Sequence, residues 1–215
     1  MVTAVTVFEQ TINQLRNDIL NGVYMPGEKI TVKQISEKYA ISGMPVREAF
    51  QHLYGEKLLQ MLPYKGAIVI GITKEYIHDV FEMNAIIEAE FGERACRRED
   101  RRQILAEMNI LYERMHEMEP GEANFLEVDA KFHSMFMVEC SNAFAKELIE
   151  KYTQIMNYFS NKYKYANTRE RKNEIDNQHR RLVDAFEAGD GALLRRIIIQ
   201  HRDIASKTMI ANLEY

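Results

Sequence analysis

The sequence predicts a mainly α-helical chain built from a small mixed part followed by a larger all-helical part. Residues 1–72 combine helical periodicity with two short apolar runs on either side of a turn. Residues 73–215 keep a helical period almost throughout, and no strand pattern interrupts it. We therefore expect a domain boundary after residue 72 and a bundle of about six helices in the second domain.

The first domain is expected to hold three helices and a β-hairpin. After a first amphipathic helix, Thr31 can cap a short second helix and Ser42 a third. Pro45 is tolerated in that third helix because amides of the first turn have no intrahelical acceptor. The apolar runs 58–62 and 67–70 flank a turn and predict a hairpin. This order is typical of a winged helix-turn-helix, a small DNA-binding module.

The composition is that of an ordinary globular protein and excludes several classes. Hydrophobic residues make up 46% of the chain and charged residues 28%. The sequence has no apolar run of membrane-spanning length and no signal-peptide pattern. Its two cysteines, Cys96 and Cys140, lack the spacing of a disulfide framework or a thiolate zinc site. We expect a cytoplasmic protein without a membrane segment.

Charge is distributed unevenly between the two parts. Residues 1–70 hold seven Lys/Arg against six Asp/Glu, a balance of +1, and the remainder hold 21 against 26, a balance of −5. The asymmetry has the sign expected if the first part meets phosphate and the second does not. It is small, so a DNA-binding function has to rest on motif geometry.

The third helix, residues 43–54, is the element expected to read DNA. One of its faces is an apolar stripe, and the opposite face carries Met44, Arg47 and Gln51. Arginine is shaped to read guanine and glutamine can read adenine, while the helix start with Ser42 can bind a phosphate. An ordinary amphipathic helix with solvated charges would show the same pattern. The choice between the two interpretations depends on the surrounding motifs.

These motifs resemble the GntR family of bacterial regulators in order and spacing over residues 8–70. The segments that carry the resemblance are Asn21-Gly22-Val-Tyr-Met-Pro26-Gly27-Glu28, Ile35-Ser-Glu, Ile41-Ser-Gly-Met-Pro45-Val46-Arg47-Glu48-Ala49-Phe50 and Lys65-Gly66-Ala67. The resemblance implies that Arg47 contacts bases and that Lys33 occupies a basic position that contacts DNA. It also implies that Gly66 lies at the tip of a wing, where the neighbouring Lys65 would meet the DNA backbone or minor groove.

The chain departs from the family pattern at one reading position. The family usually has Ser-Arg-Thr-Pro where this chain has Ser42, Gly43, Met44 and Pro45. A base-reading guanidinium is therefore missing, which could remove about 1–3 kcal/mol of base discrimination. We expect an unusual operator or weaker binding than is typical of the family.

The second domain places four residues of types that bind metals on apolar helical stripes. Asp129 and His133 share one stripe, His179 lies on a second and His201 on a third. A buried carboxylate needs a cation, a donor network or a proton. The four residues could together form a 3-His-1-carboxylate site for zinc, nickel, manganese or iron. The alternative is that each histidine is a satisfied core residue and that Asp129 forms a salt bridge to one of them.

Residues 73–215 resemble the FCD effector domain of the FadR-type branch of the GntR regulators. The segments that carry the resemblance are Asp129-Ala-Lys-Phe132-His133, Ser141-Asn142, Gln178-His179, Ala185-Phe-Glu-Ala-Gly-Asp190 and His201. The resemblance implies a divalent ion at these positions, with an organic acid completing its coordination. Where the family commonly has a carboxylate-clamping arginine, this chain has Asn84 on an inward-facing stripe, where it can hydrogen-bond an effector without offering it a charge. The alternative is that Asn84 is a buried amide bonded to a neighbouring helix. We therefore expect an effector that is less acidic than usual or one held mainly by the metal.

These observations predict a DNA-binding transcription regulator rather than an enzyme. We expect a homodimer on a palindromic double-stranded operator, with operator affinity modulated by a small-molecule effector. Repression is the common habit of the family. A regulator whose metal is purely structural, or is itself the signal, stays open as an alternative. A 3-His-1-Asp metalloenzyme is disfavoured because no general base or nucleophile motif accompanies the four ligands.

Overall fold

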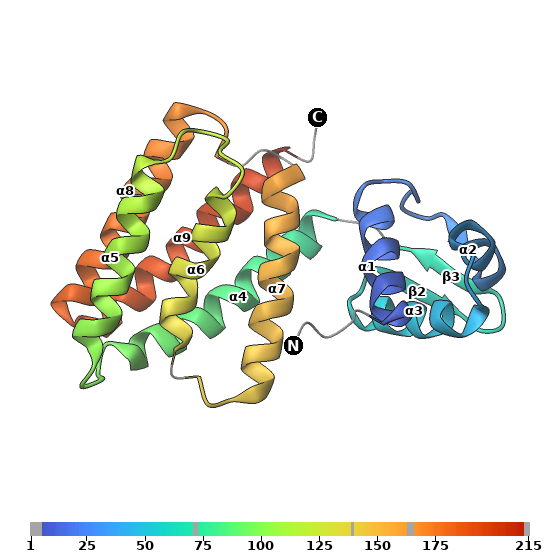
Figure 1. Ribbon diagram of the computed structural model, residues 1–215, viewed down its shortest axis with the longest axis horizontal. Coiled ribbons are helices and arrows are strands. Elements are labelled where there is room, and N and C mark those ends of the chain that lie inside the picture. Colours follow the sequence, from blue (N-terminus) through green and yellow to red (C-terminus); the bar gives the residue numbers. More distant parts are fainter. Residues whose placement is uncertain (1–5, 71–72, 139, 163–165, 213–215) are drawn as a thin grey trace. The chain divides into compact units, whose positions relative to one another are not determined.

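The computed structural model describes residues 6–70, 73–138, 140–162 and 166–212 (Figure 1). The chain separates into two compact units, Met1–Thr73 and Lys74–Tyr215. The first unit holds three helices and three short strands, as a winged helix-turn-helix requires. Its elements are α1 (Val7–Leu20), β1 (Lys29–Ile30), α2 (Val32–Tyr39), α3 (Gly43–Gly55), β2 (Leu59–Leu62) and β3 (Gly66–Val69).

In the first unit, side-chain capping is present at the start of α2 and absent at the start of α3. Thr31 accepts a hydrogen bond from the Gln34 amide and the Gln34 side chain accepts one from the Thr31 amide, which forms a capping box at the start of α2. Ser42 occupies the equivalent position before α3, but its side chain makes no capping hydrogen bond. The expected Ser42 cap is therefore wrong in that detail. The third residue after it is Pro45, which has no N–H to donate.

The hairpin of the first unit carries a third strand that the sequence did not predict. β3 pairs with β2 on one side and with β1 on the other, both antiparallel. Strand β1 is two residues long, too short to show an alternating pattern. Gly66 opens β3 with a φ of +99°, and a Cβ atom there would lie 2.1 Å from the carbonyl oxygen of Ile30. A glycine is therefore required where β1 approaches the tip of the hairpin.

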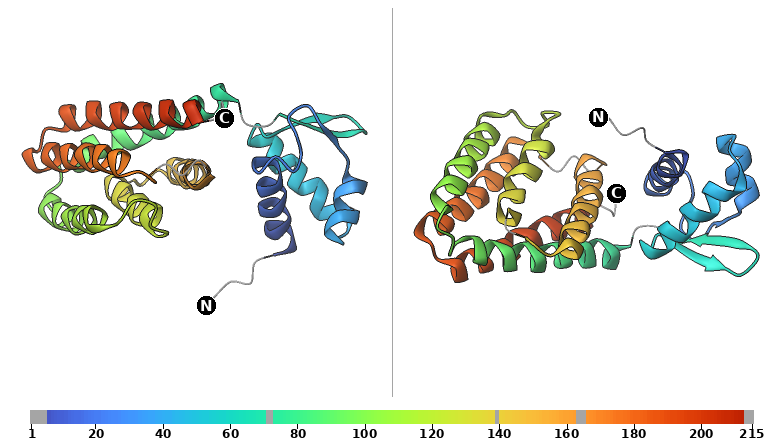
Figure 2. Two further views of the ribbon diagram at one scale, coloured as in Figure 1. Left: turned by 90° about the horizontal axis from the view of Figure 1, so that it is seen from above. Right: turned by 60° about the horizontal axis from the view of Figure 1, so that its bottom comes forward.

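The second unit is a bundle of six α-helices and one 3₁₀ turn, and its described residues contain no strand (Figures 1 and 2). Its elements are α4 (Lys74–Ala95), α5 (Arg101–Glu117), α6 (Phe125–Ser134), the 3₁₀ turn η1 (Met135–Met137), α7 (Ala143–Lys162), α8 (Arg169–Ala188) and α9 (Gly191–Asn212). The predicted fold class is thus confirmed. Among the described residues, no helix combines the length and the apolar character needed to cross a bilayer.

The bundle is organised around α4 and α9, which lie side by side in the views of Figure 2. Gly92 on α4 permits this close approach, because a Cβ atom there would lie only 2.9 Å from the Cδ1 atom of Ile198 on α9. α8 packs between α5 and α9, while α7 packs against α4 and α6. Phe132, Phe136 and Phe186 are fully buried in the core. His133 and His179 interrupt this core next to Phe132 and Phe136, and His201 stacks on His133.

Candidate metal centre and DNA interface

The structure brings together the four residues expected to bind a metal. Asp129 and His133 project from α6, His179 from α8 and His201 from α9. The three imidazoles are buried, and the side chain of Asp129 is 18% exposed. One ligand nitrogen of each histidine lies within 4.8 Å of the others. The apolar stripes predicted from the sequence therefore converge on one place in the bundle.

Distances within the cluster are those of atoms that could share one ion. The Nε2 atoms of His133 and His179 are 3.2 Å apart, and Oδ1 of Asp129 lies 3.2 Å from Nε2 of His179. Oδ1 of Asp129 is 3.9 Å from Nε2 of His133. Ligand atoms held at about 2.0–2.2 Å from one metal lie roughly 3 to 3.5 Å apart at neighbouring positions. A void of about 30 Å³, bordered by Asp129, His133 and His201, adjoins the cluster.

Partners outside the cluster orient two of the imidazoles. Nδ1 of His133 hydrogen-bonds Glu88 of α4, and Nδ1 of His201 lies 2.8 Å from Oε1 of Gln178. Carboxylate and amide oxygens can only accept, so each Nδ1 carries the proton and each Nε2 keeps its lone pair. The lone pairs of His133 and His201 thus share the cluster with the carboxylate of Asp129. Either a cation among these acceptors or a proton on Nε2 of His179, 3.2 Å from both His133 and Asp129, would stabilise them, and metal-binding histidines adopt the first arrangement.

The protonation states also suit a metal. Burial, followed by the neighbouring imidazoles of His179 and His133, holds the pKa of His201 well below its ordinary value. Burial and the nearby guanidinium of Arg202 lower the pKa of His133, although Glu88 opposes the shift. Burial would raise the pKa of Asp129, but the imidazoles of His133 and His179 outweigh it and lower the pKa. Neutral imidazole and ionised carboxylate are the forms that bind a cation.

A cavity of about 530 Å³ lies beside the cluster, within the range of roughly 300–1,000 Å³ typical of small-molecule pockets. His133 and Arg202 border both this cavity and the small void next to the metal ligands. Asn84 lines the cavity from α4, as the sequence predicts, and is fully buried. Within the described part of the chain, neither its amide nitrogen nor its carbonyl oxygen has a hydrogen-bond partner. A buried amide left unpaired in this way indicates a place where a ligand or water completes the bonding.

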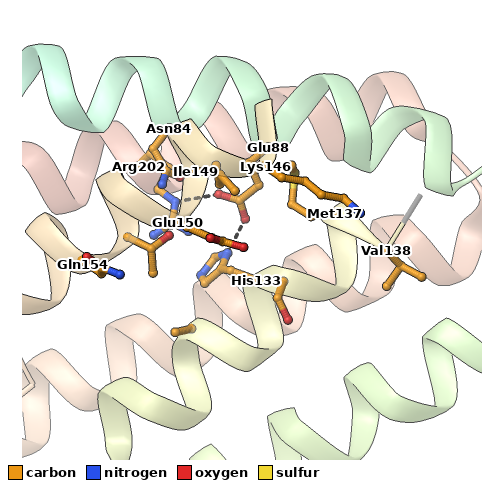
Figure 3. Close-up of a pocket in the computed structure, with 13 residues that line it drawn as sticks. Asn84, Glu88, His133, Met137, Val138, Lys146, Ile149, Glu150, Gln154 and Arg202 are labelled. Carbon is orange, nitrogen blue, oxygen red and sulfur yellow. Dashed lines mark hydrogen bonds and ion pairs between the residues drawn. The ribbon is translucent and has the colours of Figure 1, made fainter. Parts of the chain in front are cut away.

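Glu88 and Arg202 are buried polar residues that connect the cavity to the cluster (Figure 3). Oε2 of Glu88 accepts a hydrogen bond from Nε of Arg202 at 2.8 Å, and Oε1 faces His133. Burial would raise the pKa of Glu88, but the charge of Arg202 and then the imidazole of His133, which hydrogen-bonds Glu88 through Nδ1, lower it overall. Glu88 is therefore an ionised carboxylate that holds one imidazole and one guanidinium in place.

The first unit carries a groove of about 790 Å³ between α2, α3 and the hairpin. Of the residues expected to contact DNA, Lys33, Arg47, Gln51, Lys65 and Gly66 line it. Lys29 and Tyr64 line it as well and were not predicted. Four cationic side chains border the groove and none of its lining residues is acidic. The small net charge of this part of the sequence therefore conceals a local basic surface.

Two other residues expected to contact DNA lie outside this groove. Met44 is 65% exposed near the start of α3, and Ser42 is exposed just before it. Gly43 lies between them, and a Cβ atom at this position would lie 3.3 Å from Cγ1 of Val32 on α2. Both side chains lie at the end of α3 that a helix-turn-helix directs into the major groove.

Comparison with known proteins places both units in one family. Residues 8–69 match the model of bacterial regulatory proteins of the gntR family, and residues 79–203 match the FCD domain. The chain belongs to the GntR family. The confirmed family also supports a regulator rather than an enzyme, because the relatives of this GntR-family chain are transcription regulators.

Individual relatives of this GntR-family chain are similar to it over most of its length. The HTH-type transcriptional repressor GlaR of Escherichia coli (strain K12) is 25% identical over 87% of this chain and 88% of its own. The gluconate operon transcriptional repressor of Bacillus subtilis (strain 168) is 26% identical over 88% of this chain and 79% of its own. The solved structure titled E. coli McbR/YncC shares the fold at a TM-score of 0.61 and 18% identity, covering 98% of this chain and all (100%) of that one.

Sequence reasoning missed Glu88, Arg202 and the orienting role of Gln178 in this GntR-family chain. Glu88 lies one helical turn after Asn84 on the inward face of α4, and the rule that identified Asp129 applies to it equally. Arg202 follows His201 directly and gives no periodic signal of its own. Its burial follows from the packing of α9 against α4, which the sequence alone does not specify.

Proposed function

We propose that this protein is a transcription repressor whose operator affinity is modulated by a small organic acid bound at a divalent metal. The observation that carries the proposal is the convergence of acceptor atoms from Asp129, His133, His179 and His201 beside a ligand-sized cavity. The metal would polarise and orient the acid when bound. Repression and response to an organic acid are supported by the names of relatives, which include a gluconate operon repressor.

The DNA half of the proposal places α3 in the major groove. Arg47 and Gln51 would meet base edges, while Lys33 and Lys65 would neutralise phosphates on either side. Met44 and Ser42 would lie at the entry of the helix, and Gly66 would let the wing approach the backbone. A homodimer would present two such heads to a palindromic operator in the cytoplasm, and effector binding would favour one arrangement of the heads over another.

Removal of the metal tests this function. We expect a chelator such as EDTA to leave the far-ultraviolet circular dichroism of the full chain unchanged. We also expect it to abolish any effect of organic acids on DNA affinity, because the acid loses its main anchor. Fluorescence anisotropy would measure binding to an operator selected from a randomised duplex library. Addition of Zn²⁺ should restore the response. A response that persists in protein shown by mass spectrometry to be metal-free would contradict the proposal.

The same experiment discriminates the structural alternative. A structural ion contributes folding free energy directly, so its removal would unfold the second unit. The site favours the sensing role because His133, a proposed ligand, lines the cavity of about 530 Å³ as well as the cluster. Loss of the helical circular dichroism signal on chelation would support the structural role instead.

A further inference from the structure

The cavity beside the candidate metal centre contains a buried guanidinium, that of Arg202, with more N–H donors than its one described hydrogen bond uses. Arg202 is 7% exposed and lines this cavity from α9. Among the described residues its only hydrogen bond runs from Nε to Glu88, whose other oxygen is engaged by His133. A guanidinium offers five N–H donors in a planar fork, and the bond to Glu88 uses only the one on Nε, so the terminal nitrogens of Arg202 are free to bind a ligand. A carboxylate is the group whose geometry matches that fork.

Asn84 supplies a second and different requirement in the same cavity. Both Nδ2 and Oδ1 of its amide are buried and have no hydrogen-bond partner among the residues that the structure describes, and Figure 3 shows the side chain beside that of Arg202. The nitrogen needs an acceptor and the oxygen needs a donor. A carboxylate can only accept, so it cannot satisfy the oxygen. A hydroxyl group both donates and accepts, which makes it suitable for the free positions of this amide.

The charge of the site determines the sign of the ligand. Glu88 and Arg202 form an ion pair that is neutral as a whole, and Asp129 adds one carboxylate, so these three groups carry minus one together. A divalent ion at the cluster changes the total to plus one. Lys146 and Glu150, which border the cavity from α7, are both exposed and cancel one another. The metal-loaded site therefore favours an anion.

We infer that Arg202 and Asn84 together recognise a hydroxycarboxylic acid, the guanidinium pairing with a carboxylate and the amide with a hydroxyl. The inference rests on the proposed function, since the acid shares the cavity with the metal. It changes the expectation drawn from Asn84 alone, that the effector would be less acidic than usual. The guanidinium absent from α4 at position 84 is supplied by α9 on the facing side of the contact between these helices.

Matched pairs of small acids test both contacts in the full-length protein loaded with Zn²⁺. The pairs are L-malate with succinate and L-lactate with propionate, which differ by one hydroxyl, and D-gluconate with D-glucitol, which differ in charge. Isothermal titration calorimetry would measure their affinities. We expect at least one hydroxy acid to bind, to bind more tightly than its partner without the hydroxyl, and to bind more tightly than the neutral polyol.

Substitutions at two positions assign the contacts. Arg202→Met should weaken binding of that hydroxy acid by about 10- to 100-fold. Arg202→Lys keeps the charge beside Glu88 and loses the fork, so it covers the case in which the methionine variant does not fold, and it should also weaken binding. Asn84→Ala should reduce the preference for the hydroxyl within a pair to about one. Arg195→Met is the matched control, because Arg195 lies on the same helix and pairs with Glu90 and Glu93 away from the cavity.

The outcomes separate this inference from the function on which it rests. Wild-type affinity in both Arg202 variants, or no preference for any hydroxy acid over its partner, would overturn the inference while leaving the metal site intact. Protein that binds Zn²⁺ and DNA but none of these acids at millimolar concentration would overturn it as well. Protein that binds no Zn²⁺ at the cluster would instead overturn the proposed function.

Discussion

His179→Ala is expected to lower the affinity of the second unit for Zn²⁺ by well over 100-fold. The Nε2 atom of His179 lies 3.2 Å from both Nε2 of His133 and Oδ1 of Asp129, which places it in the middle of the cluster. Removal of a residue that hydrogen-bonds a metal ligand typically lowers metal affinity by about 10–100-fold, and removal of the ligand itself should lower it further. Competition against a chromophoric chelator would measure the change.

The matched control for this variant is His78→Ala. His78 is exposed and belongs to a surface group with Asp79 and Glu82 that has metal-ligand spacing but no buried geometry. Its removal should leave Zn²⁺ affinity unchanged. Circular dichroism of the metal-free His179→Ala protein should show an intact bundle, because the buried apolar residues of α8, among them Ile175, Leu182 and Phe186, are unchanged. Equal affinities of the two variants would contradict the assignment of His179 as a ligand.

Arg47→Ala is expected to abolish the preference for a specific operator and to leave the fold intact. Arg47 is exposed on α3 and lines the basic groove, so no core contact is lost. One good bidentate contact to a base contributes about 1–3 kcal/mol of discrimination, and a dimer would lose two of them. Binding of selected and scrambled duplexes, followed by fluorescence anisotropy at one salt concentration, would give the ratio that should fall towards one.

Lys65→Ala serves as the comparison, since Lys65 is at the wing and is expected to meet phosphate rather than a base. Its loss should weaken binding to both duplexes equally and reduce the salt dependence of binding by about one counterion per protomer. Operator preference that survives Arg47→Ala and disappears in Lys65→Ala would show that the wing, and not α3, reads the sequence.

Periodicity was sufficient to predict most of the fold, because the decisive contacts are local. Thr31 begins α2 with a capping box that involves Gln34, three residues away. The hairpin follows from two apolar runs around one turn, and its register pairs Leu59 with Val69. Strand β1 escaped prediction because it exists only through pairing with β3, a contact distant in sequence. Ser42 looked like a capping residue, but Pro45 lacks the amide that such a cap would use.

The metal ligands could be proposed from sequence because each is a polar residue on an apolar stripe. Asp129 and His133 are one turn apart on α6, and His179 and His201 interrupt equally apolar faces. The residues that would choose the effector could not be proposed in this way. Arg202 acquires its role from the packing of α9 on α4 and from its bond to Glu88, and both are tertiary facts. A buried charge such as Arg202 needs a partner, and only the tertiary structure shows which residue that partner is.

Anomalous diffraction from crystals of the protein grown with Zn²⁺, measured above and below the zinc absorption edge, tests the central claim most directly. We predict one strong peak per chain, about 2.0–2.2 Å from a nitrogen of His133, His179 and His201 and from an oxygen of Asp129. A peak at the exposed group of His78, Asp79 and Glu82 alone would contradict the claim. So would the absence of a peak at the buried histidines in protein that retains its fold.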